Sequence, residues 1–246
     1  MKKMILAGLL AVTTFASSAT VVEMQTSQGT ITINLFDKRT PKTVENFLNY
    51  VSNDAYNNTV IHRSVNNFVI QGGGFTYDDE FKAIETAEAV TNEPVLSNVK
   101  GTIAMAKLGS DANSATSQWF FNLKDNSENL DNQNGGFTVF GQITADSYDV
   151  IDAIRELTHC GEIPVVGITT EQCADPDTVI TSANLVSINN VVVLDDDPNS
   201  SINLSPKEST NGDGSNVNPD KSSSGGAIGW FVLPLALLGF KRRRTA

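Results

Sequence analysis

The chain has 246 residues, and its 17 lysines and arginines stand against 28 aspartates and glutamates, which gives a formal net charge of −11. Proteins that bind nucleic acids present a basic surface to the phosphates, so this charge argues against that class. The length suits one domain of ordinary size with additional segments.

The first 19 residues have the three parts of a secretory signal peptide. Lys2 and Lys3 are followed by an apolar run over residues 4–12 and by small residues at 17–19. This order is typical of an export signal, so we expect cleavage after residue 19 and an oxidising compartment for the mature chain. The alternative is a buried strand or helix at the N-terminus.

Residues 20–36 show the first strand pattern. Apolar and polar side chains alternate there with a period of two, as in a half-buried antiparallel strand. The apolar members of the clearest alternation are Ile31, Ile33 and Leu35. Residues 21–26 are the expected partner strand, and residues 27–29 are the expected turn between the two.

A helix is predicted to begin at Thr40 and Pro41. Threonine is a favoured N-cap residue, and proline is tolerated in the first helical position. Apolar side chains follow at helical spacing, at Val44, Phe47, Leu48 and Val51. This single apolar stripe indicates a helix that closes one end of a sheet or barrel.

Further elements follow along the chain. Residues 101–106, 117–123, 137–143 and 185–194 read as strands, and residues 146–157 read as a second helix with one apolar face. The polar, acidic stretch 76–94 is expected to be a long loop with at most one turn of order.

The stretch 60–75 holds the candidate site. Residues 60–65 and 68–71 read as short strands joined by a turn at Asn66 and Asn67. As a hairpin they would bring Arg63, Phe68 and Gln71 to one concave surface. Glycines at 72–74 permit positive φ and close packing. Taken singly, these residues could be a surface arginine, a core phenylalanine, an edge-strand glutamine and an ordinary turn.

Read as one segment, residues 60–75 resemble the cyclophilin signature. The pieces G-T-I-A-M-A, S-Q-W-F-F-N and F-T-V-F-G-Q-I also resemble cyclophilin strands, in the order of that family. The resemblance implies a mainly β fold over residues 20–194, an eight-stranded antiparallel barrel capped by two helices. Closure of a barrel removes exposed sheet edges.

The resemblance also implies the site residues. Arg63, Phe68 and Gln71 match catalytic positions of the family. The matching substrate-binding positions are Val69, Ala106, Lys107, Leu108, Gln118, Phe120, Asn129, Leu130 and Phe137. Some of these depart from the usual pattern: Val69 stands for Met, Lys107 and Leu108 for Asn and Ala, Asn129 for Trp and Phe137 for His. These departures bear on substrate preference and on cyclosporin-type ligands.

The implied chemistry is rotation about an X–Pro amide, with no bond broken. The chain is therefore expected to be a peptidyl-prolyl cis–trans isomerase that assists the folding of exported proteins. Its partners would be proline-containing segments, it would need no cofactor or metal, and it would act as a monomer. The alternative is a non-catalytic module of the cell envelope that binds proline peptides, which Lys107, Leu108 and Asn129 leave open.

Other chemistries find little support in the sequence. His62 and His159 are the only histidines, and the chain has no G-x-S-x-G elbow of a hydrolase. It also lacks the glycine motifs of nucleotide-binding proteins. We expect His62 to be a structural side chain beside Arg63.

Cys160 and Cys173 are the only cysteines. In an exported chain a disulfide between them is expected, and the alternative is two unpaired thiols. The bridge would hold an inserted loop at residues 161–177.

The composition changes at residue 195. Residues 195–224 are acidic and rich in Ser and Asn, which predicts a flexible, disordered linker. Residues 225–246 hold Gly225, Gly226, a short apolar run and a basic end, and they resemble the GlyGly-CTERM sorting signals of Gram-negative bacteria. This implies a periplasmic, cell-surface or extracellular location, with transient membrane tethering before cleavage. A retained C-terminal anchor is the alternative.

Overall fold

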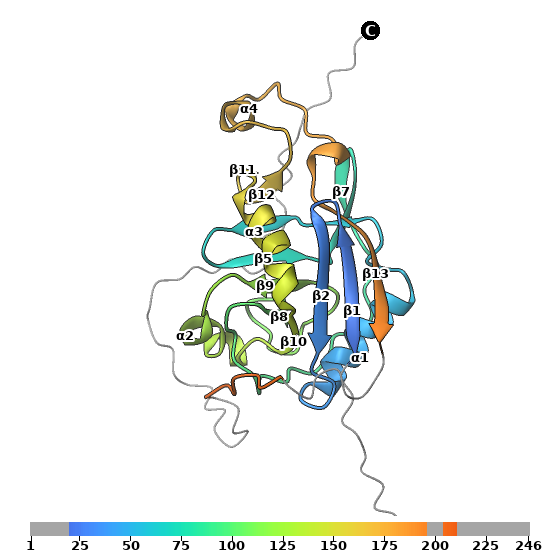
Figure 1. The fold of residues 1–246 in the computed structure, drawn as a ribbon, viewed down its shortest axis with the longest axis vertical. Coiled ribbons are helices and arrows are strands. Elements are labelled where there is room, and N and C mark those ends of the chain that lie inside the picture. The colour runs from blue at the N-terminus through green and yellow to red at the C-terminus, as the bar shows by residue number, and fades with distance from the viewer. Residues whose placement is uncertain (1–19, 196–203, 211–246) are drawn as a thin grey trace, which may run out of the picture.

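The computed structural model describes residues 20–195 and 204–210 (Figure 1). The predicted signal peptide and the predicted sorting segment lie outside these residues. Within the described part of the chain, no helix combines the length and the apolar character that a membrane span requires.

The described chain is mainly β. Its strands are β1 (Val21–Thr26), β2 (Gly29–Leu35), β3 (Thr59–Val60), β4 (Arg63–Val65), β5 (Val69–Gly72), β6 (Phe75–Asp78), β7 (Glu80–Ala83), β8 (Thr102–Met105), β9 (Trp119–Asn122), β10 (Val139–Ile143), β11 (Thr158–Cys160), β12 (Ile163–Val165) and β13 (Ser187–Asp195). Its helices are α1 (Pro41–Ser52), α2 (Ser127–Leu130), α3 (Tyr148–Glu156) and α4 (Thr170–Ala174). Single 3-10 turns lie at Gln133–Gly135, Ala145–Ser147 and Ser182–Asn184.

One curled sheet of 11 strands contains most of these elements, in the order β4-β5-β9-β8-β10-β2-β1-β13-β3-β6-β7. All of its ladders are antiparallel, and β11 and β12 form a separate hairpin. The expected antiparallel, mainly β fold is confirmed. The number of strands exceeds the expected eight, partly because the chain bends at residues 61–62 and divides one predicted strand into β3 and β4.

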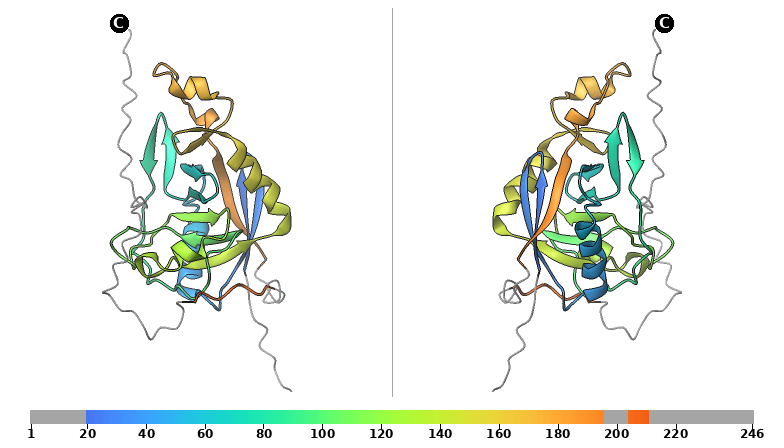
Figure 2. Two further views of the ribbon diagram at one scale, coloured as in Figure 1. Left: turned by 90° about the vertical axis from the view of Figure 1, so that its left-hand side faces the viewer. Right: turned by 90° about the vertical axis from the view of Figure 1, so that its right-hand side faces the viewer.

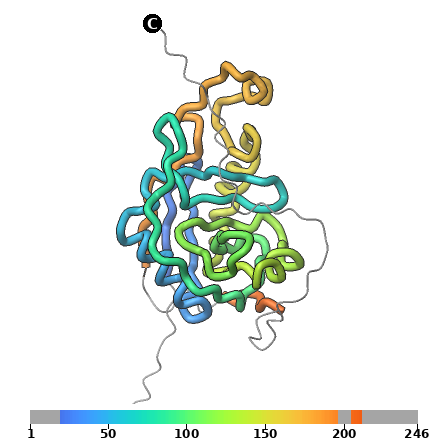
Figure 3. The backbone as a smooth tube through the Cα atoms, turned by 180° about the vertical axis from the view of Figure 1, so that it is seen from behind, coloured from blue at the N-terminus to red at the C-terminus, as the bar shows by residue number. Residues whose placement is uncertain are grey.

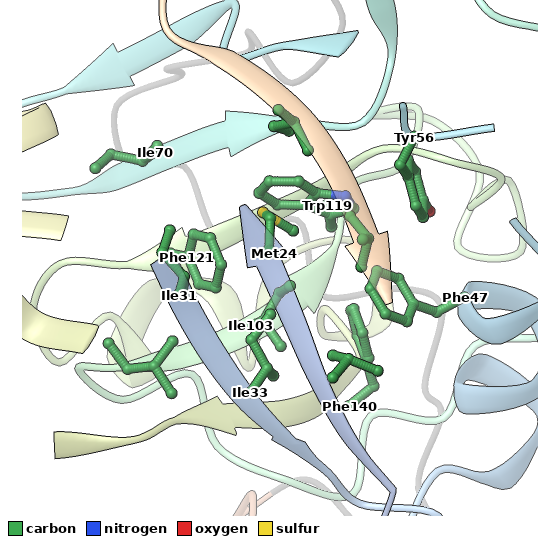
Figure 4. Close-up of a cluster of buried hydrophobic side chains, with 14 of the residues drawn as sticks. Met24, Ile31, Ile33, Phe47, Tyr56, Ile70, Ile103, Trp119, Phe121 and Phe140 are labelled. Atoms are coloured by element: carbon green, nitrogen blue, oxygen red, sulfur yellow. The ribbon is translucent and has the colours of Figure 1, made fainter. Parts of the chain in front are cut away.

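The main hydrophobic core lies inside the curl of the sheet (Figure 4). Alternate residues of β1 and β2, such as Met24 and Ile33, are fully buried there. α1 contributes Phe47, whose ring centroid lies 5.1 Å from that of Phe140 on β10. α3 contributes Ile154 to the same core, and Figure 2 shows the two helices on different sides of the sheet. Both predicted helices therefore cover the core.

The predicted boundaries are close to the observed ones. α1 begins at Pro41 with Thr40 at the N-cap, although the Thr40 side chain makes no capping hydrogen bond. The predicted helix at 146–157 is shorter, because a 3-10 turn at Ala145–Ser147 precedes α3. The predicted turn between β4 and β5 is present, with Asn67 at a φ of 54°.

The loop predicted at 76–94 is wrong in its first part. β6 and β7 form a hairpin there, with Asp79 at the turn in a left-handed conformation. The hairpin projects from the sheet and lies beside the segment that follows α4, as Figure 3 shows from behind. Tyr77 Oη donates a hydrogen bond to the Ile180 carbonyl there, at 2.9 Å. Phe75 and Tyr77 on β6 and Phe81 on β7 alternate with polar residues, and Tyr77 and Phe81 pack against a buried cluster. Each strand has only four residues in an acidic stretch, so this short alternation was not recognised in the sequence.

Two other segments are more ordered than predicted. Residues 161–177, expected to be an inserted loop, contain β12 and α4. Residues 204–210, expected to belong to the flexible linker, run beside residues 95–97. Ser97 N donates to the Lys207 carbonyl at 2.8 Å, and Ser209 N donates to the Val95 carbonyl at 3.0 Å. The linker prediction is therefore wrong for these seven residues. Residues 196–203 and 211–224 of the predicted linker lie outside the described residues.

Candidate active site

A row of register partners crosses the sheet at the candidate site. Arg63 on β4 pairs with Gln71 on β5, and Gln71 pairs with Phe120 on β9. Phe120 pairs in turn with Ala104 on β8, and Ala104 with Val139 on β10. Residues directly opposite one another in neighbouring strands share a face of the sheet. These five side chains therefore lie on one face of the sheet, and Figure 1 labels four of their strands, β5, β9, β8 and β10, in that order.

The neighbouring row faces the other way, into the main core. Ile70 pairs with Phe121, and Phe121 pairs with Ile103. All three belong to the main core cluster (Figure 4), whereas Phe120 and Ala104 belong to a second hydrophobic cluster. The sheet thus holds the fold together with one face and carries the candidate site on the other.

The second cluster gathers the apolar residues predicted for the proline pocket. It contains Val69, Ala106, Phe120, Leu130 and Phe137, and Phe68 packs against it. The rings of Phe120 and Phe137 meet edge to face, with their centroids 5.8 Å apart. We call this cluster, together with Phe68, the apolar wall. Phe120 and Leu130 are fully buried and Phe68 is only half-buried, so the wall reaches solvent at Phe68. The predicted departure at Phe137 therefore places an aromatic ring in the wall.

Arg63 stands at the polar end of this row. Its side chain is 14% exposed, and its Nε donates to Glu162 Oε2 at 2.6 Å. Glu162 lies between β11 and β12, and its carbonyl accepts a hydrogen bond from Ser64 N at 2.6 Å. The sequence did not point to Glu162, because 99 residues separate it from Arg63.

The two glutamines predicted beside the pocket meet each other. The buried Gln71 donates from Nε2 to Gln118 Oε1 at 2.8 Å. A β-carbon added at Gly74 would lie 2.7 Å from the side chain of Gln118. Gly74 therefore leaves the room that Gln118 needs, as close packing around the glycines predicted. Gln71 lies opposite Arg63 in register, and its amide is oriented by Gln118.

The residues that depart from the family pattern occupy different places. Lys107 is buried, and its Nζ donates to the carbonyls of Asn134 at 2.7 Å and Gly136 at 2.6 Å. The ammonium also lies 4.9 Å from the centroid of the Phe137 ring. Burial lowers the pKa of Lys107 from 10.5 to about 8. This lysine holds the segment before Phe137 in place.

Leu108 and Asn129, in contrast, lie at the surface. Leu108 is 47% exposed, and Asn129 is exposed on the short helix α2. Neither belongs to the apolar wall. The structure therefore brings together most of the predicted site residues and leaves these two outside the wall.

His62 is a buried neighbour of the site. Its ring meets Phe75 edge to face at a centroid distance of 4.9 Å. Burial lowers the pKa of His62 from 6.5 to about 4, and the positive charge of Arg63 acts in the same direction. The imidazole is therefore neutral near neutral pH, which supports its interpretation as a structural side chain.

A buried polar network behind the wall was missed by sequence reasoning. The Asp131 carboxylate accepts hydrogen bonds from Ser97 Oγ at 2.6 Å, from Asn98 N at 2.8 Å and from Asn98 Nδ2 at 2.9 Å. Asn98 Nδ2 also donates to the Phe137 carbonyl at 3.0 Å. Through Asn98, the network fixes the backbone of a wall residue. Its members are far apart in sequence, so spacing gave no signal for it.

Comparison with known proteins agrees with this geometry. Residues 21–183 match the family model described as cyclophilin type peptidyl-prolyl cis-trans isomerase/CLD. A peptidyl-prolyl cis-trans isomerase of Acinetobacter baylyi is 42% identical over 156 residues, which cover 62% of this chain and 80% of that protein. Peptidyl-prolyl cis-trans isomerase B of Escherichia coli is 42% identical over 143 residues, covering 55% of this chain and 84% of that protein.

A solved structure supports the fold independently. A cyclophilin type peptidyl-prolyl cis-trans isomerase of Cryptosporidium parvum superposes with a TM-score of 0.52 at 19% identity, covering 73% of this chain and 99% of that one. At this identity the likeness concerns the fold alone. The family match spans most of the described chain, and the bacterial relatives are covered over most of their length. The chain therefore belongs to the cyclophilin-type peptidyl-prolyl cis–trans isomerases and is an isomerase.

Proposed function

We propose that this isomerase acts on proline-containing segments of exported proteins and that Arg63 stabilises the twisted X–Pro amide. The observation that carries the proposal is the row in which Arg63 and Gln71 adjoin Phe120 on one face of the sheet. A cation and an apolar wall side by side suit a substrate with an amide next to an apolar ring.

The reaction asks for no proton transfer. An X–Pro amide resists rotation because resonance gives its C–N bond double-bond character, with a barrier of ~18–20 kcal/mol. When the amide twists, the proline nitrogen regains its lone pair and can accept a hydrogen bond. A donor that interacts more strongly with this state than with the planar one lowers the barrier.

Arg63 supplies that donor in the proposal. Its guanidinium is a planar cation whose N–H donors have a fixed arrangement. The wall formed by Phe68, Phe120 and Leu130 would hold the proline ring and exclude water, which strengthens the interaction. Gln71, held by Gln118, would orient the substrate backbone beside it. The resemblance to the family implies that the backbone of Ala106 also helps to bind the peptide.

A protease-coupled assay on an X–Pro peptide tests the mechanism. Arg63→Ala should lower kcat/KM by roughly 10²-fold, which corresponds to about 3 kcal/mol of transition-state stabilisation. Arg155→Ala is the matched control, because Arg155 forms ion pairs with Asp152 and Glu156 on α3. Turnover of Arg63→Ala close to that of the control would refute the role of Arg63.

The second candidate function is a module that binds proline peptides without useful catalysis. Its supporting observation is the exposed pair Leu108 and Asn129, which changes the rim at positions implied to bind substrate. Titration with a proline peptide separates the two functions. Binding by the wild type without acceleration of isomerisation would favour the module.

The proposed site of action is the cell envelope or the medium of a Gram-negative bacterium. The N-terminal pattern of residues 1–19 supports export. The disulfide between Cys160 and Cys173 supports an oxidising compartment. Fractionation of the native host, with N-terminal sequencing of the mature chain, tests this. Recovery of the intact chain from the cytoplasm would contradict it.

We further propose that the C-terminal segment tethers the chain to the membrane only until it is cleaved near Gly225 and Gly226. The support is the glycine pair, the apolar run at 227–240 and the basic end of the sequence. That run is shorter than the ~20 residues of a typical span. Intact-mass measurement on native protein decides between cleavage and a retained anchor.

A further inference from the structure

The turn between β11 and β12 delivers a carboxylate to the candidate active site. Cys160 pairs with Ile163, so Gly161 and Glu162 form the two-residue turn between them. Gly161 has a φ of +68°. Two-residue hairpin turns need a positive φ in their first central residue, and glycine adopts it without strain. The turn geometry thus places Glu162 at the tip of the hairpin, against β4.

Glu162 is held to β4 by two contacts on adjacent residues. Its carbonyl accepts from Ser64 N at 2.6 Å, and its Oε2 accepts from Arg63 Nε at 2.6 Å. The backbone contact fixes where the residue sits, and the side-chain contact then reaches Arg63. The fold therefore orients this carboxylate toward Arg63, because the backbone of Glu162 is itself bonded to β4.

A covalent link stabilises the base of this turn. Cys160, directly before Gly161, is bonded to Cys173 in α4. α4 is itself capped, because Thr169 and Gln172 exchange side-chain and backbone hydrogen bonds at its N-terminus. The hairpin that carries Glu162 is thus attached to a second ordered element.

We propose that Glu162 is a positioning residue for Arg63, a role that rests on the proposed catalytic role of Arg63. A charged acceptor on Nε restricts rotation of the planar guanidinium, so its remaining donors keep one orientation before substrate arrives. Pre-set orientation of a reacting group raises the rate without adding a new contact to the substrate. The disulfide-linked hairpin is the scaffold that holds this carboxylate in place.

The exposure of the two side chains separates this role from stability. Glu162 is 49% exposed, although Arg63 is only 14% exposed, so water reaches the carboxylate and screens the ion pair, which limits its contribution to folding. Loss of the Glu162 carboxylate should therefore leave the melting temperature nearly unchanged. An effect on turnover without an effect on melting is what a positioning role predicts and a structural role does not.

The test compares Glu162→Ala, Glu162→Gln and Asp152→Ala in the intact protein. Asp152 is the matched control, since it is 43% exposed and pairs with Arg155 on α3. Glu162→Ala should lower kcat about fivefold, a loss of the size expected for one partly exposed ion pair, with KM unchanged. Glu162→Gln should recover part of the rate, because its amide oxygen still accepts from Nε. Asp152→Ala should match the wild type.

A double-mutant cycle tests whether Glu162 acts through Arg63. In an Arg63→Lys background the guanidinium that Glu162 would orient is absent, so Glu162→Ala should cause no further loss of kcat. An equal loss in both backgrounds, or wild-type turnover of Glu162→Ala, would overturn the inference. If Arg63→Ala itself stays active, the proposed function fails first. If only Glu162→Ala stays active, the positioning role alone fails.

Removal of the disulfide provides an independent test of the proposal. The double substitution Cys160→Ser with Cys173→Ser should lower kcat in the same direction as Glu162→Ala and should add nothing when combined with it. A large further loss in the combined variant would show that the hairpin acts on the site by a route other than Glu162, and this would contradict the proposal.

Discussion

Acidification should destabilise the protein through His62. The imidazole is buried against Phe75, and burial lowers its pKa from 6.5 to about 4. In the unfolded chain the same group binds a proton near its ordinary pKa of about 6.5. Between these two values the unfolded state binds more protons than the folded state, so stability falls as the pH falls.

The size of the effect follows from the two pKa values. The neutral form contributes its full stabilisation above about pH 6.5, and this contribution is lost progressively until the pH passes about 4. At ~1.4 kcal/mol per pH unit, the difference amounts to about 3 kcal/mol. That is a large part of the ~5–15 kcal/mol by which folded proteins are usually stable.

Urea unfolding at pH values from about 4 to 7 measures this loss, and a His62→Gln variant is the comparison. The wild type should lose about 3 kcal/mol more than the variant over this interval. Proton NMR of the imidazole in the wild type gives the pKa directly, so the prediction remains testable if the variant does not fold. A titration of His62 near 6.5, or equal acid sensitivity of both proteins, would refute the reasoning. A bell-shaped rate profile near that pH would instead show that His62 takes part in the reaction.

Three further predictions concern the wall and its support. Phe120→Ala should destabilise the protein by roughly 3–5 kcal/mol in urea unfolding and raise KM for an X–Pro peptide, because it removes core volume and pocket surface together. Asp131→Ala should cost roughly 3 kcal/mol in the same experiment, since Ser97 and Asn98 would keep buried donors without an acceptor. Lys107→Met should remove a rise in stability between about pH 8 and 10.5, because the wild-type folded state holds the Lys107 proton less tightly than the unfolded state does.

The sequence correctly predicted those features that depend on residues close together in the chain. The period of two in residues 20–36 predicted β1 and β2, and the Thr40 and Pro41 pair predicted the start of α1. The order of motifs implied where Arg63, Gln71 and Phe120 would meet, and the register of β4, β5 and β9 agrees with it. These features depend on neighbouring residues or on a long motif.

The features that sequence reasoning missed depend on contacts between distant segments. Glu162 reaches Arg63 across 99 residues, and Asp131 reaches Ser97 across 34. Neither carboxylate stands in a motif, and both are ordinary polar residues until the fold brings them to a partner. The β6–β7 hairpin was missed for another reason, since each of its strands has only four residues and the acidic residues around its turn make the stretch resemble a loop.

The three glycines connect the fold to the site. A β-carbon at Gly72 would lie 2.8 Å from the Trp119 ring, and one at Gly73 would lie 2.5 Å from Trp119 Nε1. Trp119 is fully buried and pairs with Gly72 between β5 and β9, so the bulky ring fits only against residues without side chains. A slip of one residue would bring a side chain against the ring and would turn Gln71 towards the core. The fit of Trp119 to the glycines therefore fixes the register that keeps Gln71 beside Arg63, and the residues that fill the core decide which side chains the site receives.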